Sequence, residues 1–142
     1  MNFLCHVFTP NILQFNCPYV YGRPMLTAKL QWEDKPSRYF EFLIDTGADY
    51  TLIPDTDAAL LGISYNELPE HEIRVEAANF TFIHAKKTII KIKINETSLK
   101  IPVLVSKDPM DRLLGRKGVF NHFEVNFQEC YQNVTFTKNI PQ

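Results

Sequence analysis

The chain has 142 residues, enough for one domain with a substantial hydrophobic core. Hydrophobic residues make up 45% and charged residues 22%, a composition that excludes a disordered or collagen-like chain. The net charge of −1, with both signs mixed along the chain, argues against nucleic acid or an anionic membrane as the main partner. No apolar run is long enough to cross a membrane, so we expect no membrane partner.

Short strands separated by turn residues dominate the chain, and the clearest is the Ile/Lys alternation of residues 90–94. Residues 1–18 fit no clear pattern and are interpreted as an N-terminal arm or an edge strand. The predicted strands are 25–32, 39–44, 73–75, 80–84, 88–94, 98–105, 124–128 and 133–137. Short helices are predicted at 55–62, which ends at a glycine, and at 116–122. The pattern predicts an all-β fold with one or two short helices, as a single domain over residues 1–142.

The metal-binding residue types give no pattern. The three cysteines (Cys5, Cys17 and Cys130) form no CxxC pair, and the four histidines show no ligand spacing. We therefore expect no metal and no cofactor. The start of the chain lacks a basic segment followed by an apolar run, so no secretory signal is predicted. A reducing, cytoplasmic location is the expectation.

One acidic residue stands out in the stretch FLIDTGADYTLIP, residues 42–54. Asp45 follows the apolar residues 42–44 directly and precedes Thr46 and Gly47. An ordinary reading is a turn aspartate that accepts hydrogen bonds from backbone amides after a strand. A second reading is catalytic, because Asp-Thr-Gly after an apolar strand is typical of aspartic proteases.

Two further stretches favour the catalytic reading. They are Arg23-Pro24-Met25-Leu26-Thr27-Ala28-Lys29-Leu30, upstream of Asp45, and Leu113-Leu114-Gly115-Arg116, about 70 residues downstream. Together with the Asp45 stretch, they resemble the retropepsin family, the retroviral-type proteases and their cellular relatives. The resemblance covers roughly residues 19–128, and the layout is closest to short archaeal and bacterial members.

The resemblance implies a retropepsin-like acid protease barrel with one lobe per chain. It also implies that Asp45, Thr46 and Gly47 are catalytic. No other aspartate of the chain is followed by Thr-Gly, so the partner of Asp45 would be Asp45 of a second copy, in a homodimer. Peptide hydrolysis by this route needs one carboxylate to accept a proton from water and a second, protonated, to donate to the carbonyl. Aspartic proteases are the standard example of two carboxyl groups that share one proton.

The same resemblance assigns roles around Asp45. Thr46 would bond across the dimer, and Gly47 would leave room for the substrate backbone. Asp49 would pair with Arg116 in its own chain and with Arg23 across the interface. These three residues (Arg23, Asp49 and Arg116) are the structural and dimer set. The expected substrate-binding residues are Ala48, Asp49, Ala77, Ala78, Asn79, Met110 and Leu113, with Leu26 and Val105 also expected to line wall pockets.

Residues 73–83 occupy the place of the flap, the hairpin that covers the site in retropepsins. The sequence departs from the viral pattern there, because no glycine occurs between Gly62 and Gly115. The main hypothesis is a homodimeric aspartic endopeptidase that cuts peptide or protein substrates. The alternative is a non-proteolytic module that keeps the fold for dimerisation or peptide binding.

Overall fold

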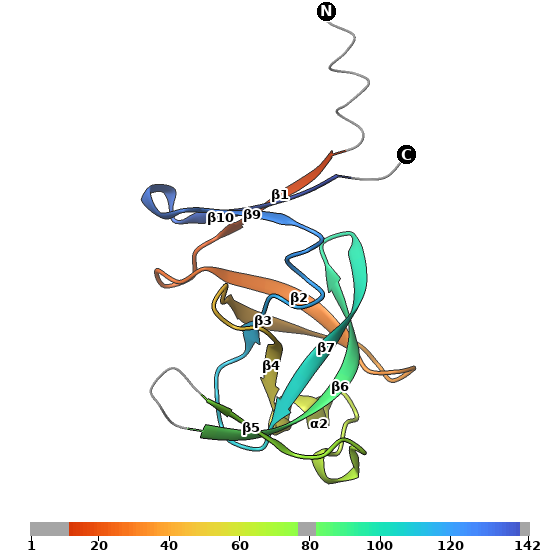
Figure 1. Cartoon of the computed structure of the whole chain (residues 1–142). Helices are drawn as coiled ribbons and strands as arrows, with labels where there is room; N and C mark the ends of the chain where they lie inside the picture. Colours follow the sequence, from red (N-terminus) through yellow and green to blue (C-terminus); the bar gives the residue numbers. More distant parts are fainter. Residues whose placement is uncertain (1–11, 77–81, 140–142) are drawn as a thin grey trace, which may run out of the picture.

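The computed structural model describes residues 12–76 and 82–139, which form ten strands and one α-helix (Figure 1). The strands are β1 (Ile12–Pro18), β2 (Met25–Gln31), β3 (Arg38–Ile44), β4 (Thr51–Pro54), β5 (Ile73–Glu76), β6 (Phe82–Ile94), β7 (Thr97–Ser106), β8 (Leu113–Leu114), β9 (Glu124–Gln128) and β10 (Asn133–Asn139). The helix is α2 (Asp55–Leu60), and single 3-10 turns lie at Tyr65–Glu67 and Glu129–Tyr131.

Six strands close into a barrel in the order β2-β3-β8-β4-β7-β6, because β2 also pairs with β6. β5 extends the sheet by pairing with the first part of β6, so that this hairpin projects from the barrel. The expected mostly-β barrel with a short helix is therefore confirmed.

The barrel core follows from the period-two pattern of its strands. Ile90, Ile92 and Ile94 point inward and are fully buried, whereas Lys91 and Lys93 between them are exposed. Burying each such aliphatic side chain contributes about 1.5–3 kcal/mol, which makes this alternation sufficient to fix the strand register.

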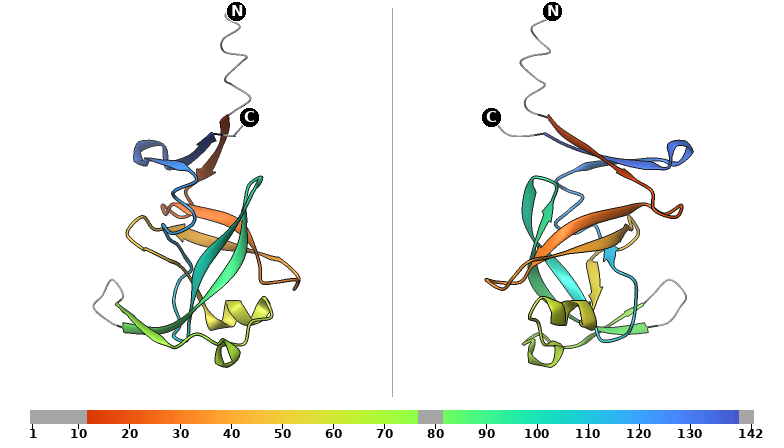
Figure 2. Two further views of the ribbon diagram at one scale, coloured as in Figure 1. Left: turned by 45° about the vertical axis from the view of Figure 1, so that its right-hand side comes forward. Right: turned by 180° about the vertical axis from the view of Figure 1, so that it is seen from behind.

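The first strand, β1, and the last two, β9 and β10, form a second sheet in the order β1-β10-β9 at one end of the barrel (Figures 1 and 2). Phe15 and Phe136 stack with ring centroids 5.0 Å apart, and Phe123 meets both rings edge-on. The buried members of this sheet belong to the same apolar cluster as the barrel core. The region 1–18 thus contributes an edge strand, β1, from Ile12 to Pro18.

Several sequence expectations about the elements need correction. Residues 82–84 of one predicted strand and the predicted strand 88–94 are joined in a single strand, β6 (Phe82–Ile94), and residues 80 and 81 lie outside the described residues. The short strands β4 and β8 were not predicted. Residues 116–122 form successive turns and no helix, because Gly118 has a positive φ of 79° and a Cβ there would lie 2.8 Å from Ile101 Cγ2.

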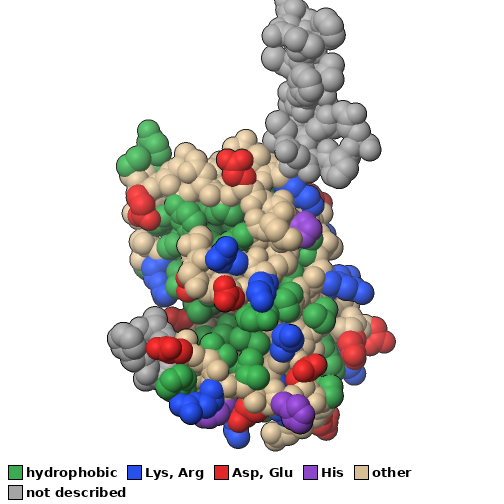
Figure 3. Space-filling model, in the orientation of Figure 1, with side chains coloured by type: hydrophobic (Ala, Val, Ile, Leu, Met, Phe, Trp, Pro, Cys, Tyr) green, Lys and Arg blue, Asp and Glu red, His purple; other side chains and the backbone are tan. Residues whose placement is uncertain are grey.

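The surface carries mixed charge, in keeping with the net charge of −1. On the face shown in Figure 3, acidic and basic side chains are interspersed, and apolar side chains are exposed between them. Within residues 12–76 and 82–139, no helix has the length and apolar character needed to cross a membrane.

Candidate active site

Asp45 begins the loop that joins β3 to β4. Its backbone N–H donates to the carbonyl of Leu114 at 3.0 Å, which fixes the start of the loop against β8. Its side chain is half-buried, and Oδ1 accepts a hydrogen bond of 2.9 Å from the backbone N–H of Gly47. Thr46 and Gly47 themselves are exposed. The loop therefore holds one oriented carboxylate at the surface of the barrel.

The Leu113–Arg116 stretch passes directly behind this loop. β8 lies between β3, with which it is parallel, and β4, with which it is antiparallel. A Cβ at Gly115 would lie 2.2 Å from the carbonyl carbon and oxygen of Tyr50, so only glycine fits. The N–H of Gly115 donates to the hydroxyl of the fully buried Thr51 at 3.1 Å. The two motifs recognised in the sequence thus pack against each other, and each fixes the other's backbone.

Two more backbone hydrogen bonds complete this support. The N–H of Arg116 donates to the carbonyl of Ala48 at 2.9 Å, and the N–H of Lys117 donates to the carbonyl of Asp49 at 2.8 Å. The side chains of Asp49 and Arg116 form no ion pair in the described part of the chain, so the expected Asp49–Arg116 pair within one copy is absent. Both side chains are exposed.

Arg23 lies beside the same loop. Met25 pairs with Leu43, and the N–H of Ile44 donates to the carbonyl of Pro24 at 2.9 Å, so the register places Arg23 opposite Asp45. Its guanidinium contacts Asp111 at 3.5 Å, and both side chains are largely exposed. An exposed pair of this kind contributes at most about 1 kcal/mol to folding.

The predicted wall residues divide into two groups. Met110 and Leu113 pack on a small cluster beside the loop, formed by Leu52, Ala85 and Leu104 and also contacted by Tyr50, Val75 and Ile83. This cluster joins the root of the β5–β6 hairpin to the Asp45 loop. In contrast, Leu26 and Val105 are buried in the barrel core, so they offer no wall surface to a ligand. Ala77, Ala78 and Asn79 lie outside the described residues.

One contact near the site was missed in the sequence. The backbone N–H of His84, on β6, donates to Asp108 Oδ2 at 2.8 Å, and the N–H of Lys107 donates to the His84 carbonyl at 2.8 Å. The His84 hydrogen bond holds the pKa of the Asp108 carboxyl below its ordinary value. The buried hydroxyl of Ser106 also donates to the Asp108 carbonyl at 2.8 Å. These bonds hold the loop before Met110 against the root of the β5–β6 hairpin. The turn composition of residues 106–109, Ser-Lys-Asp-Pro, is the sequence feature that could have indicated this loop.

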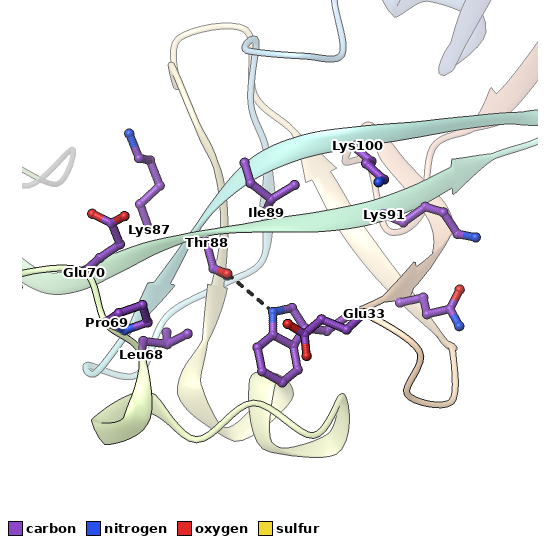
Figure 4. Close-up of a pocket in the computed structure, with 11 residues that line it drawn as sticks. Glu33, Leu68, Pro69, Glu70, Lys87, Thr88, Ile89, Lys91 and Lys100 are labelled. Atoms are coloured by element: carbon purple, nitrogen blue, oxygen red, sulfur yellow. Dashed lines mark hydrogen bonds between the residues drawn. The ribbon is translucent and has the colours of Figure 1, made fainter.

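A metal site and a ligand pocket elsewhere on the chain are the other features to consider. Across residues 12–76 and 82–139, no three His, Cys, Asp or Glu side chains gather in a way that would hold a metal ion. A pocket of about 670 Å³ lies away from Asp45, between the end of β2, the segment around Leu68 and strand β6 (Figure 4). It contains no residue of the predicted site.

Comparisons with known proteins agree with this arrangement. Residues 34–117, more than half of the chain, match the family described as "gag-polyprotein putative aspartyl protease". The structure resembles a retropepsin-like aspartic protease from Rickettsia conorii, with a TM-score of 0.69 and 16% identity over 92% of this chain and 94% of that one. It also resembles EIAV protease, solved with the inhibitor HBY-793, with a TM-score of 0.50 and 20% identity over 66% of this chain and 82% of that one.

At 16% and 20% identity, the two solved structures establish the fold alone. No curated protein sequence matches the chain. The family match is more specific, because it spans the Asp45 loop and the Leu113–Arg116 stretch that supports it. The chain has the retropepsin-like fold and belongs to the gag-polyprotein aspartyl protease family.

Proposed function

We propose that the protein is a homodimeric aspartic endopeptidase in which two copies of Asp45 share one active site. The proposal depends on the structure of the Asp45 loop. It presents one oriented carboxylate next to exposed backbone at Thr46 and Gly47, and it is the chain's one Asp-Thr-Gly. Half of a two-carboxylate site is therefore present in each copy.

The chemistry follows from bringing two such loops together. Two carboxyl groups within about 3 Å cannot both be ionised, so the pair holds one proton. The ionised Asp45 accepts a proton from a water molecule as that water attacks the peptide carbonyl carbon. The protonated Asp45 of the second copy donates to the carbonyl oxygen, giving a tetrahedral intermediate. Collapse of this intermediate breaks the C–N bond, with a proton delivered to the leaving amine.

Exposed tyrosines near the Asp45 loop support the proposal that a second copy binds on this side. The turn from Val20 to Arg23, closed by hydrogen bonds between these two residues, presents Tyr21 with 99% of its side chain exposed. Tyr131 is 77% exposed. Tyr19 connects the two regions, since its N–H donates to Gln132 and its hydroxyl to Glu129, both at 2.8 Å. Exposed aromatic side chains are typical of interface anchors, so we assign this surface to the dimer contact.

The substrate would be an extended peptide held between the β5–β6 hairpin and the Asp45 loop. Ala48 and Asp49 lie on the loop, and Met110 and Leu113 provide apolar surface at the side. We propose apolar side chains next to the cut bond for this reason. Because the catalytic pair needs one proton, cleavage is expected to be fastest at acidic to mildly acidic pH.

The alternative is a non-proteolytic module that dimerises or binds peptides through the same surfaces. One sequence feature favours it: the flap region lacks the glycines that let the backbone of a hairpin tip approach a ligand closely. Peptide binding without turnover would distinguish this alternative from the endopeptidase.

The proposal is tested by incubating the purified protein with a mixture of peptides and identifying products by mass spectrometry. Wild type is expected to cut, and a statine-type inhibitor, which mimics the tetrahedral intermediate, is expected to stop it. The Asp45→Asn variant should be inactive although folded, whereas Asp111→Asn, an exposed aspartate outside the loop, should cut normally. Equal cleavage by Asp45→Asn and wild type would rule out the mechanism.

A further inference from the structure

One outer face of the barrel, away from the Asp45 loop, carries a group of four lysines. Lys29 is on β2, Lys91 and Lys93 are on β6, and Lys100 is on β7; we call these four residues the lysine face. Arg23 lies opposite Asp45 just before β2, and Lys29 follows it by six residues. Along an extended strand this is about 20 Å, so the lysine face lies well outside the proposed active site.

The strand register places these lysines directly opposite one another. Lys29 pairs with Lys93 between β2 and β6, and Lys91 pairs with Lys100 between β6 and β7. Directly opposed residues of antiparallel strands have Cβ atoms only about 5 Å apart, and like charges in such positions are destabilising. The barrel thus contains two unfavourable lysine pairs on three neighbouring strands.

Nothing within the described part of the chain neutralises this charge at close range. None of the four ammonium groups lies within 4.0 Å of a carboxylate of residues 12–76 or 82–139. The Lys29 ammonium nitrogen lies 5.3 Å from the centroid of the Tyr39 ring instead. Lysines also protect sheet edges against aggregation, but β2, β6 and β7 are not edges here, because pairing of β2 with β6 closes the barrel.

A hollow lies among these side chains. It has a volume of about 240 Å³ and is lined by Lys29, Gln31, Ser37, Lys91, Lys93 and Ser98. Gln31 and Lys91 also line the 670 Å³ pocket of Figure 4, where the Thr88 hydroxyl accepts a hydrogen bond from the Trp32 indole. The two hollows adjoin at Gln31 and Lys91. Because Glu33 and Glu70 line the larger one, the acidic residues of a bound segment would lie over the smaller hollow.

We infer that the lysine face is a docking surface for an extended acidic segment of a partner protein. Every second residue of an extended peptide points to the same side, about 6.6 Å apart, which is also the separation of Lys91 and Lys93 along β6. Carboxylates at alternate positions would meet these lysines, while Ser37, Ser98 and Gln31 offer hydroxyl and amide donors.

A single-stranded nucleic acid fits the face less well. Non-specific binding of single strands uses exposed aromatic rings on which bases stack. Of the two nearby rings, Trp32 is half-buried and bonded to Thr88. Tyr39 is 69% exposed with the Lys29 ammonium over its ring, and a single exposed ring does not provide the successive stacking surfaces that such binding uses.

Binding is tested by fluorescence anisotropy at low ionic strength with a labelled octapeptide of alternating glutamate and serine. The protein carries Asp45→Asn, so that the result does not depend on whether the chain cuts peptides. We expect saturable binding that weakens about tenfold in Lys91→Gln/Lys93→Gln. The control Lys107→Gln/Lys138→Gln loses the same charge elsewhere and should bind normally. Equal loss in both double variants, no binding, or tighter binding of an oligothymidylate would each overturn the inference.

The opposed lysines are tested separately by urea unfolding. Removing one member of a repulsive pair, in Lys100→Gln, should raise the unfolding midpoint at low ionic strength. The gain should disappear at about 1 M salt, where charges more than about 3 Å apart are screened. A lower midpoint in Lys100→Gln at low salt would contradict the repulsion on which the inference depends.

Discussion

Gly115 lies so close to the carbonyl group of Tyr50 that a single added Cβ would be 2.2 Å from its carbon and oxygen. The contact joins the strand behind the site to the end of the Asp45 loop. A Gly115→Ala variant must shift this backbone, which we expect to cost about 3 kcal/mol of the free energy of unfolding and to abolish peptide cleavage. Thermal unfolding and a cleavage assay measure both effects.

Gly47→Ala is the matched comparison for Gly115→Ala. A Cβ at Gly47 would meet one neighbour only, Asp45 Oδ1 at 3.3 Å, so this variant should keep nearly wild-type stability. It should nevertheless cut slowly, because the added methyl group lies where the peptide backbone is proposed to pass. A Gly115→Ala protein as stable as wild type would show that the close contact is not needed.

Arg23→Ala should weaken the dimer while changing the stability of the isolated chain by less than about 1 kcal/mol. The reason is that its partner within the chain, Asp111, is an exposed carboxylate 3.5 Å away, whereas the proposed partner across the dimer is Asp49. Sedimentation equilibrium measures the dissociation constant, and we expect an increase of about tenfold.

Asp111→Asn is the control for Arg23→Ala, since it breaks the same contact within the chain and leaves the arginine in place. It should dimerise normally. If the two variants weaken the dimer equally, the arginine acts through Asp111 and not through the second copy.

Asp108 should make the stability depend on pH. The His84 backbone N–H holds the pKa of Asp108 below its unfolded value of about 3.9, so its contribution is fully present above that value. The contribution is lost as the pH falls through the folded pKa. At about pH 6 the urea midpoint of unfolding should therefore be higher for wild type than for Asp108→Asn. This difference between the two midpoints should become smaller toward about pH 2.

The chief cause of this pKa shift is a backbone donor, so His84→Ala should retain most of the pH dependence. Loss of the whole effect in His84→Ala would assign it to the imidazole instead. A gap between wild type and Asp108→Asn that stays constant at every pH would show that the carboxyl is not linked to folding.

Cys17 should be unreactive in the folded protein. Burial raises the pKa of its thiol to about 11, so almost none is present as the reactive thiolate near neutral pH. In a Cys5→Ser/Cys130→Ser variant, an aromatic disulfide reagent should label Cys17 only after urea is added. The same shift predicts stability that is present below about pH 9 and lost as pH rises through about 11. Rapid labelling without urea would show that the β1 region opens readily.

Much of the barrel was predictable because its strands carry local signals. The alternation at residues 90–94 gave both the strand and its buried face, and the glycine at 62 correctly marked the end of the helical segment. The β4 and β8 strands lacked such signals, since they consist of four and two residues. Their parallel and antiparallel pairing depends on residues far apart in the sequence.

Side-chain surroundings were harder to predict than elements. Leu26 and Val105 were expected at a pocket wall, but both are buried. Residues 103–105 are apolar on both sides of β7, so the sequence could not show which side faces the core. The alternation of Leu26 with Thr27 and Lys29, in contrast, already indicated that Leu26 faces the core. The buried Asp57 pairs with Arg112, and this contact between α2 and the segment before β8 had no local signature. The His84–Asp108 contact was missed because its main donor is a backbone group, which every residue carries.

If two copies of Asp45 form one active site, mixing active and inactive subunits will reveal it. Wild type and Asp45→Asn protein are combined in varying ratios at constant total concentration, left to exchange subunits, and assayed for peptide cleavage. Paired half-sites predict activity that falls with the square of the wild-type fraction, to about one quarter in an equal mixture. A linear fall, to about one half, would mean that each chain acts alone, without an Asp45 from a second copy.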